Sequence, residues 1–154
     1  FFKFINPTIR YNNVRLDNNR WCLKYGKYVD HGRLTTTYGT ANMPHSVPWI
    51  KEVLEVIAPE DAFDNSWVQV YEPGGFHPIH NHAGTKISGS GCLFLNDGQS
   101  TYFQDPLHQS NTATSKVEVG DALIWDPEIY HFSPPIMEKR IILAFNLRET
   151  NDTN

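Results

Sequence analysis

Residues 67–104 read WVQVYEPGGFHPIHNHAGTKISGSGCLFLNDGQSTYFQ, a stretch in which short apolar runs alternate with turn sequences. Pro73-Gly74-Gly75 and Asn96-Asp97-Gly98 have the composition of turns. The runs between them are rich in β-branched and aromatic residues, which favour strands. Strands are therefore predicted at residues 67–72, 86–96 and 101–104.

The same alternation extends on both sides of this stretch. Downstream strands are predicted at residues 116–119, 121–125 and 140–147, and upstream strands at 21–25 and 33–38. A polar loop is expected at 105–115, and turns at Gly120 and at Ser133-Pro134-Pro135. Many short strands at close spacing predict a β-sandwich or barrel of the jelly-roll type.

One segment, residues 47–58, has helical rather than strand periodicity. Four apolar residues recur at helical spacing and form a single stripe: Ile50, Val53, Leu54 and Ile57. Ser46 is placed to cap the start of this helix, and Pro59 to end it. We expect a mainly β fold in which one N-terminal helix supports the sheet from outside.

The overall composition suits one globular domain. The chain has 154 residues, of which 40% are hydrophobic, and a domain of this size buries roughly 70% of its unfolded surface. We expect one domain over residues 1–154, with N-terminal strands and the helix in 1–66 and the jelly-roll core in 67–147. Cys22 and Cys92 are far apart, and we expect buried, reduced thiols.

Charge and hydropathy narrow the choice of partners. The net charge is −4, with no run of Lys or Arg, which argues against nucleic acid because phosphate binding draws on clustered cations. No signal-peptide pattern is visible, and no apolar run approaches the ~18 residues of a membrane span. We therefore expect a cytoplasmic protein without a membrane partner.

Three histidines lie within six residues, at His77, His80 and His82. Side chains two residues apart in a strand project to the same face, so His80 and His82 could aim both imidazoles at one metal ion. His77 is offset by three and would face the other side of a straight strand. The alternative is a polar loop in which these histidines only form hydrogen bonds.

His131 is the candidate for a third ligand. It lies between two predicted strands, with Tyr130 and Phe132 beside it and a Pro-Pro turn after it. The alternative is a half-buried turn histidine bonded to backbone. The remaining loop histidines are interpreted as solvated: His31, His45 and His108.

Arg140 opens a strongly apolar strand, nine residues after His131. Burying an unpaired charge is costly, so such an arginine usually meets a carboxylate, which its planar fork binds bidentately. Alternatively it points into water or pairs with an acidic residue of the protein. The Tyr71 hydroxyl could donate to the same carboxylate, or Tyr71 is a core aromatic residue. Gln69 shares a strand face with Tyr71 and is a further polar contact.

The order of these motifs resembles the Fe(II)/2-oxoglutarate dioxygenase superfamily, and in particular the 2OG-Fe(II) oxygenase group common in marine bacteria and phages. His80-Asn81-His82 comes first, then a strand opened by Gly120-Asp121, then His131, and then Arg140. The likeness covers residues 67–147. It implies a double-stranded β-helix, or cupin-like jelly roll, with iron bound by His80 and His131. It also implies that Arg140, helped by Tyr71, holds the distal carboxylate of 2-oxoglutarate.

The resemblance further implies an oxygenase that uses Fe(II), 2-oxoglutarate and O₂, releases succinate and CO₂, and accepts ascorbate as an auxiliary reductant. We expect it to hydroxylate a side chain of a peptide or protein, for example a proline. His82 departs from the superfamily, which usually carries a carboxylate two residues after the first histidine. A three-histidine site leaves zinc, nickel and manganese open as metals, and water in place of His82 is the alternative.

Two other functions are weighed. The first is a base-oxidising or demethylating dioxygenase, because residues 33–39 and Gln69-x-Tyr71 are similar to AlkB-type nucleic-acid demethylases. That branch has Asn in place of Gln69 and a second Arg in place of Asn146. The second is a cupin-like three-histidine metal protein without oxoglutarate, because Gly74-x₅-His80-x-His82 matches the start of a cupin motif. The Glu expected after it is absent, and residues 86–87 are Lys and Ile.

Overall fold

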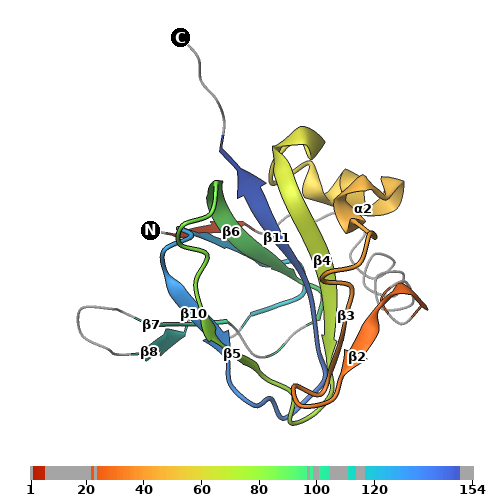
Figure 1. Ribbon diagram of the computed structural model, residues 1–154, viewed down its shortest axis with the longest axis vertical. Helices are drawn as coiled ribbons and strands as arrows, with labels where there is room; N and C mark the ends of the chain where they lie inside the picture. The colour runs from red at the N-terminus through yellow and green to blue at the C-terminus, as the bar shows by residue number, and fades with distance from the viewer. Residues whose placement is uncertain are drawn as a thin grey trace.

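The structure is a computed structural model that describes residues 2–5, 22, 24–96, 98, 101–104, 111–113 and 117–149. Its strands form two antiparallel sheets (Figure 1). The larger sheet has the order β1 (Phe2–Ile5), β9 (Ala122–Trp125), β6 (Ile87–Phe94), β11 (Arg140–Arg148), β4 (Phe63–Tyr71), β3 (Leu34–Thr36) and β2 (Lys27–Val29). The smaller sheet has the order β5 (His77–His80), β10 (Tyr130–Ser133), β7 (Tyr102–Gln104) and β8 (Asn111–Ala113). This is the predicted mainly β, double-stranded β-helix fold.

The predicted helix is present but shorter, as α2 (Pro48–Leu54), between the single turns η1 (Pro44–Ser46) and η2 (Glu60–Ala62). Its apolar stripe packs on the larger sheet, as expected. The prediction of Ser46 as the cap is wrong: Val47 is the N-cap, and the Ser46 hydroxyl donates to the Met43 carbonyl at 2.7 Å. Pro48 sets the start instead, because its fixed φ suits the first helical position.

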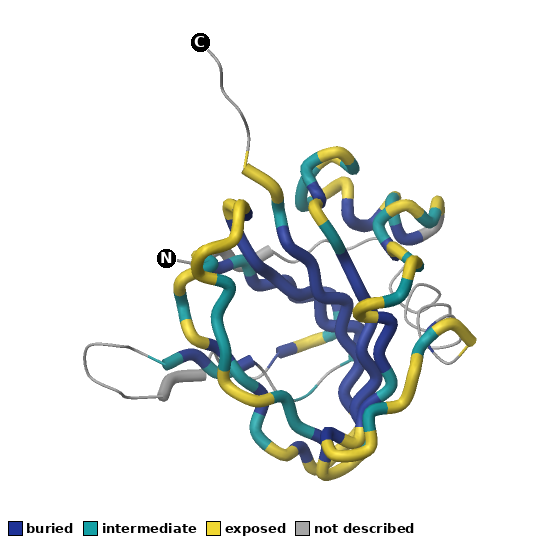
Figure 2. The backbone as a smooth tube through the Cα atoms, viewed as in Figure 1, coloured by how far each residue is buried: buried dark blue, intermediate teal, exposed yellow. Residues whose placement is uncertain are grey.

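Alternation along the central strand β11 separates two layers of buried side chains. Ile141, Leu143 and Phe145 pack with the α2 stripe. Ile142 and Ala144 belong to the layer between the two sheets. Figure 2 shows this buried centre as a dark band along β4, β6 and β11. The face of β11 that begins with Arg140 therefore lines the space between the sheets, where the candidate site lies.

Six predicted strands are present with shifted ends, as β3, β4, β6, β7, β9 and β11. Two expectations are wrong. In the segment 21–25 the described residues Cys22, Lys24 and Tyr25 are helical, because Gly26 N–H donates back to the Cys22 carbonyl and the Cys22 thiol lies in the core. In 116–119, Val117 forms only an isolated bridge with Gly98.

Several strands were not predicted: β1, β2, β8 and β10. The β8 strand falls in the expected polar loop. It forms by pairing with β7. Both cysteines are buried free thiols, as expected. Over the described part of the chain, no helix is both long enough and apolar enough to cross a membrane.

Candidate functional site

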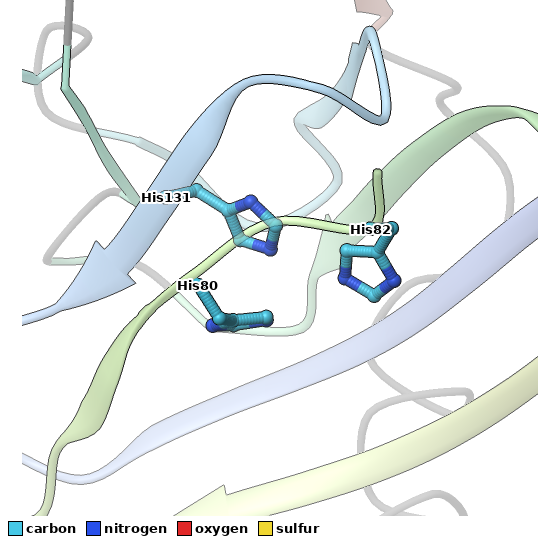
Figure 3. A group of neighbouring side chains, drawn as sticks. All are labelled: His80, His82 and His131. Carbon is cyan, nitrogen blue, oxygen red and sulfur yellow. The ribbon is translucent and has the colours of Figure 1, made fainter. Parts of the chain in front are cut away.

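Three imidazoles converge where β5 meets β10. His80 is the last residue of β5, His82 follows two residues later, and His131 lies on β10. Their candidate ligand nitrogens all lie within 4.8 Å of one another, and Figure 3 shows the rings gathered around one point. Nitrogens bound to one ion at roughly 2.1 Å can be at most about 4.2 Å apart. Small ring rotations therefore suffice to enclose a metal ion.

The backbone holds each ring in place. His80 and His131 are directly opposite in the β5–β10 ladder, so both side chains project to one face. The His82 N–H donates to the Pro127 carbonyl at 2.8 Å, which fixes the segment after β5 against the β9–β10 connection. The sequence predicted that His80 and His82 lie in one strand and aim at one metal ion. The two rings do converge, but β5 ends at His80, so His82 lies outside the strand.

Two of the rings have a defined tautomer. His80 Nδ1 lies 2.8 Å from the Pro78 carbonyl oxygen, and His131 Nδ1 lies 3.1 Å from the Ile129 carbonyl oxygen. A carbonyl oxygen can only accept, so each Nδ1 carries the proton. In a neutral ring the lone pair then lies on Nε2, the arrangement found in most metal-ligating histidines.

Burial favours the neutral form of two of these imidazoles, those of His131 and His82, by lowering the pKa of each. It lowers the pKa of His131 to about 3, with the neighbouring His80 adding to the effect. Burial also lowers the pKa of His82, again with a contribution from His80. Because a metal binds only the unprotonated ring, the site is prepared for a cation at neutral pH.

The prediction that His77 faces away from His80 is wrong. His77 pairs with Ser133 while His80 pairs with His131, so three residue steps on β5 match two on β10. This β-bulge returns His77 to the same face, and its ring centroid lies 4.5 Å from that of His80. Burial, with His80 and Arg140 nearby, lowers the pKa of His77 to about 4.

Arg140 lies at another part of the same cavity, with only 4% of its surface exposed. Its Nη2 donates to the Thr101 hydroxyl at 2.8 Å, and its guanidinium stacks 5.2 Å from the Tyr71 ring centroid. Its Nε is buried without a hydrogen-bond partner. Among the described residues, no carboxylate forms an ion pair with Arg140. The cavity thus contains a buried positive charge that suits an anion.

Tyr71 and Gln69 line the cavity beside Arg140, on the shared face of β4. The Tyr71 hydroxyl donates to Gln69 Oε1 at 2.5 Å. Burial raises the pKa of Tyr71 to about 12, so the hydroxyl keeps its proton and remains a donor. The structure therefore brings together all six site residues that the sequence singled out.

The cavity between the sheets has a volume of about 60 Å³. One water needs roughly 10–15 Å³, so the space suits a small molecule. Its lining includes residues that sequence reasoning missed: Ser90, Thr101, Trp125, Ser133 and Asn146. Strand alternation from Arg140 points to Asn146, whereas Thr101 and Ser133 come to the site only through sheet pairing.

The other loop histidines have different environments. His31 is exposed, as expected. The interpretation of His45 as solvated is wrong: its Nδ1 lies 2.6 Å from the Ser66 hydroxyl, and its ring stacks on Phe63. His108 lies outside the described residues.

A second, larger cavity of about 400 Å³ adjoins the histidines. It shares Trp67 and Gln69 with the cavity between the sheets, along with the histidines at 77, 80 and 82. It extends across β3 and β2, which is an edge strand of the larger sheet. The arrangement resembles a substrate groove that leads to a metal centre.

Comparison with solved structures finds the same architecture in a Pseudomonas putida prolyl-4-hydroxylase, with a TM-score of 0.69 and 13% identity over 97% of this chain and 93% of that one. An oxidoreductase of the 2OG-Fe(II) oxygenase family from Burkholderia pseudomallei has a TM-score of 0.68 and 9% identity, over 97% and 85%. The chain has the 2OG-Fe(II) oxygenase fold. Within that fold, HygX from Streptomyces hygroscopicus, solved with nickel and 2-oxoglutarate, has a TM-score of 0.66 and 13% identity, over 97% and 83%.

No protein-family model matches the sequence, and a comparison with curated proteins found no match either. At these identities the structural likeness establishes the oxygenase fold. The chemistry depends on the side chains in the cavity rather than on the fold.

Proposed function

We propose that this protein is an Fe(II)- and 2-oxoglutarate-dependent oxygenase that hydroxylates a side chain of a peptide or protein, for example a prolyl residue. One observation carries the proposal: a single cavity has three converging imidazoles and a buried arginine that, among the residues the structure describes, has no carboxylate partner. The first feature fits a divalent cation, and the second fits the free carboxylate of a small dicarboxylic acid.

His80, His82 and His131 are the proposed iron ligands. Among the described residues, no Asp or Glu joins this cluster, so the site supplies three neutral nitrogens. The chemistry that bound iron and 2-oxoglutarate supply is O₂ activation coupled to decarboxylation of 2-oxoglutarate to succinate and CO₂. The carbonyl partners of His80 and His131 orient their rings for this role.

Arg140, Thr101 and Tyr71 are proposed to hold the distal carboxylate of 2-oxoglutarate. The guanidinium offers the unpaired Nε–H, and Thr101 positions it through Nη2. The protonated Tyr71 hydroxyl can turn from Gln69 to the carboxylate. All these groups are buried, so the charge pair forms away from water, where it is stronger.

The peptide substrate is supported by the adjoining groove. Aromatic side chains line it, namely Tyr38, Trp67 and Phe76, and Lys27 is the only lysine or arginine among its lining residues. One cation is too little for a nucleic-acid groove, which needs clustered Lys and Arg. A neighbour of the same fold is a prolyl hydroxylase, which adds support. We also propose that residues 1–154 form one domain.

The test is succinate formation by the purified protein with Fe(II), ascorbate, 2-oxoglutarate and O₂. We expect slow succinate release even without a substrate, and none from Arg140→Ala or from Arg140→Met, which keeps more of the side-chain volume. Removing one partner of a buried charge pair costs about 2–5 kcal/mol, so 2-oxoglutarate affinity should fall at least about 30-fold.

Lys139→Ala is the matched control, because Lys139 is the exposed neighbour and pairs with Glu72 at 3.9 Å. It should release succinate at the wild-type rate. No succinate from the wild-type protein would favour the cupin-like alternative, in which three histidines hold a metal without oxoglutarate. Normal turnover in both Arg140 variants would refute the role of Arg140.

A further inference from the structure

We propose that Trp125 is a second hydrogen-bond donor to 2-oxoglutarate, and that its indole N–H binds an oxygen of the cosubstrate beside the metal. The inference rests on the proposed function and adds a residue to it. Trp125 is neither one of the proposed metal ligands nor one of the residues proposed above to hold 2-oxoglutarate.

The first observation is an unpaired donor. Trp125 is the last residue of β9 and is 5% exposed, and its Nε1 is buried without a hydrogen-bond partner. Buried N–H groups are almost always paired, because an unpaired one has lost its water without replacement. In the described part of the chain only two buried side-chain atoms are unpaired in this way, Trp125 Nε1 and Arg140 Nε.

The second observation is that both residues line the same cavity. A ligand with acceptor oxygens at both ends would satisfy both donors, whereas no apolar occupant would satisfy either. The dicarboxylate proposed for Arg140 is such a ligand. The two unpaired atoms therefore have one common explanation.

The third observation is the position of the indole relative to the metal ligands. The Trp125 ring centroid lies 4.8 Å from that of His131. In the larger sheet Trp125 pairs with Ser90, which pairs with Asn146, six residues along β11 from Arg140. Trp125 thus lines the cavity beside the metal ligand His131, and on the larger sheet it is well separated from Arg140.

The chemistry of indole limits what this contact can be. Indole N–H only donates, so Trp125 cannot ligate the metal or accept a proton. The oxygens of 2-oxoglutarate nearest a metal are those of its keto and adjoining carboxylate groups, and both are acceptors. Trp125 is therefore a binding and positioning residue, which sets the orientation of the cosubstrate at the metal.

Trp125→Phe tests the proposal, because phenylalanine keeps an aromatic ring against His131 and Phe103 and removes the N–H. We expect the Kd for 2-oxoglutarate, measured by calorimetry on Ni(II)-loaded protein, to rise about 10- to 100-fold, as for a hydrogen bond to a charged group. The affinity for Ni(II) alone should not change. The melting temperature without 2-oxoglutarate should stay the same or rise, because an unpaired buried donor has been removed.

Tyr102→Phe is the matched control. Tyr102 lies on β7 against Phe132 and is not among the residues that line the cavity, and this change also removes one polar hydrogen from an aromatic side chain. It should bind 2-oxoglutarate like the wild-type protein. An equal loss in both variants, or a lower melting temperature and weaker nickel binding in Trp125→Phe, would show a structural role and overturn the inference.

The result also separates this inference from the proposed function. If the wild-type protein binds 2-oxoglutarate and Trp125→Phe binds it equally well, the inference fails and the proposed function stands. If the nickel-loaded wild-type protein does not bind 2-oxoglutarate, both fail.

Discussion

The imidazole of His82 occupies the position where the resembling superfamily usually carries a carboxylate. Its side-chain nitrogen lies within 4.8 Å of those of His80 and His131, so this chain offers three nitrogens to the metal. A shorter side chain with an oxygen donor at the same position could reach the same ion, because the segment is held by the His82–Pro127 backbone hydrogen bond.

We predict that His82→Ala weakens Co(II) or Ni(II) binding by more than about 100-fold, because one of three ligands is removed. Loss of a residue that only contacts a ligand costs roughly 10–100-fold. His82→Asp should recover much of this affinity. Calorimetric metal titration measures both, with the exposed His31→Ala as the control. Unchanged affinity in His82→Ala would mean that His82 does not ligate and that water takes its place.

His45 is a half-buried histidine outside the site. Its backbone N–H donates to the Ser66 hydroxyl oxygen at 3.0 Å, and its ring Nδ1 lies 2.6 Å from the same hydroxyl. Burial lowers the pKa of His45, Arg148 lowers it further, and Glu60 and Asp64 oppose the shift.

We predict a His45 pKa below 6.5 in an NMR titration of the folded protein. Since the unfolded chain takes up this proton more readily, the contribution of His45 to stability is present above pH 6.5 and is lost as the pH falls through the folded pKa. A pKa at or above 6.5 in the wild-type protein would contradict this account.

At the level of single elements, the packing of strand β6 requires its backbone to lie close to the side chain of Phe145 on β11. Gly91 pairs with Phe145, and a Cβ at position 91 would lie 2.5 Å from Phe145 Cζ and 2.6 Å from the Leu123 carbonyl oxygen. At Gly89 the nearest atom would be 3.5 Å away, which is ordinary contact.

We therefore predict that Gly91→Ala lowers the free energy of unfolding by about 1–3 kcal/mol, the usual cost of overpacking. Gly89→Ala should change it much less, which makes it the matched control in the same strand. Urea denaturation followed by circular dichroism measures both. Equal stability of the two variants would show that Phe145 moves aside without cost.

The β5–β10 ladder is the second element on which the site depends. Its bulge sets His77 and His80 on one face, although three residue steps separate them. No local pattern in His77-Pro78-Ile79-His80 predicts this, because the extra residue is defined only against the partner strand.

At the level of the whole molecule, the proposed ligands connect the two sheets. The three histidines belong to β5, the segment after it and β10, whereas Arg140 and Tyr71 belong to β11 and β4. A metal alone therefore ties together parts of the smaller sheet. A metal with 2-oxoglutarate would tie the smaller sheet to the larger one.

We predict two separate increases in melting temperature, one on adding Ni(II) and a second on adding 2-oxoglutarate. At a concentration of 100 times its Kd, each ligand raises the free energy of unfolding by about 2.7 kcal/mol, because it binds only the folded protein. Arg140→Met should keep the first increase and lose the second, and a chelator should abolish both. A second increase of wild-type size in Arg140→Met would place 2-oxoglutarate elsewhere.

Local patterns were sufficient for much of this protein. Strand alternation predicted β4, β6 and β11, and the apolar stripe predicted that α2 packs on the sheet, because these periodicities reflect which face is buried. An arginine at the start of an apolar strand predicted a buried charge, and closely spaced histidines predicted a cluster of ring nitrogens. Each of these features depends on residues near one another in the chain.

Other features were settled only when distant segments paired. The helical conformation at Cys22, the return of His77 to the site and the position of Trp125 beside His131 follow from core packing, a bulge and sheet registers. All three features have the same physical reason. They depend on which residues become buried and which strands pair, and the chain acquires both properties only when the sheets assemble. The sequence contains these residues, but it does not show which distant residues they contact.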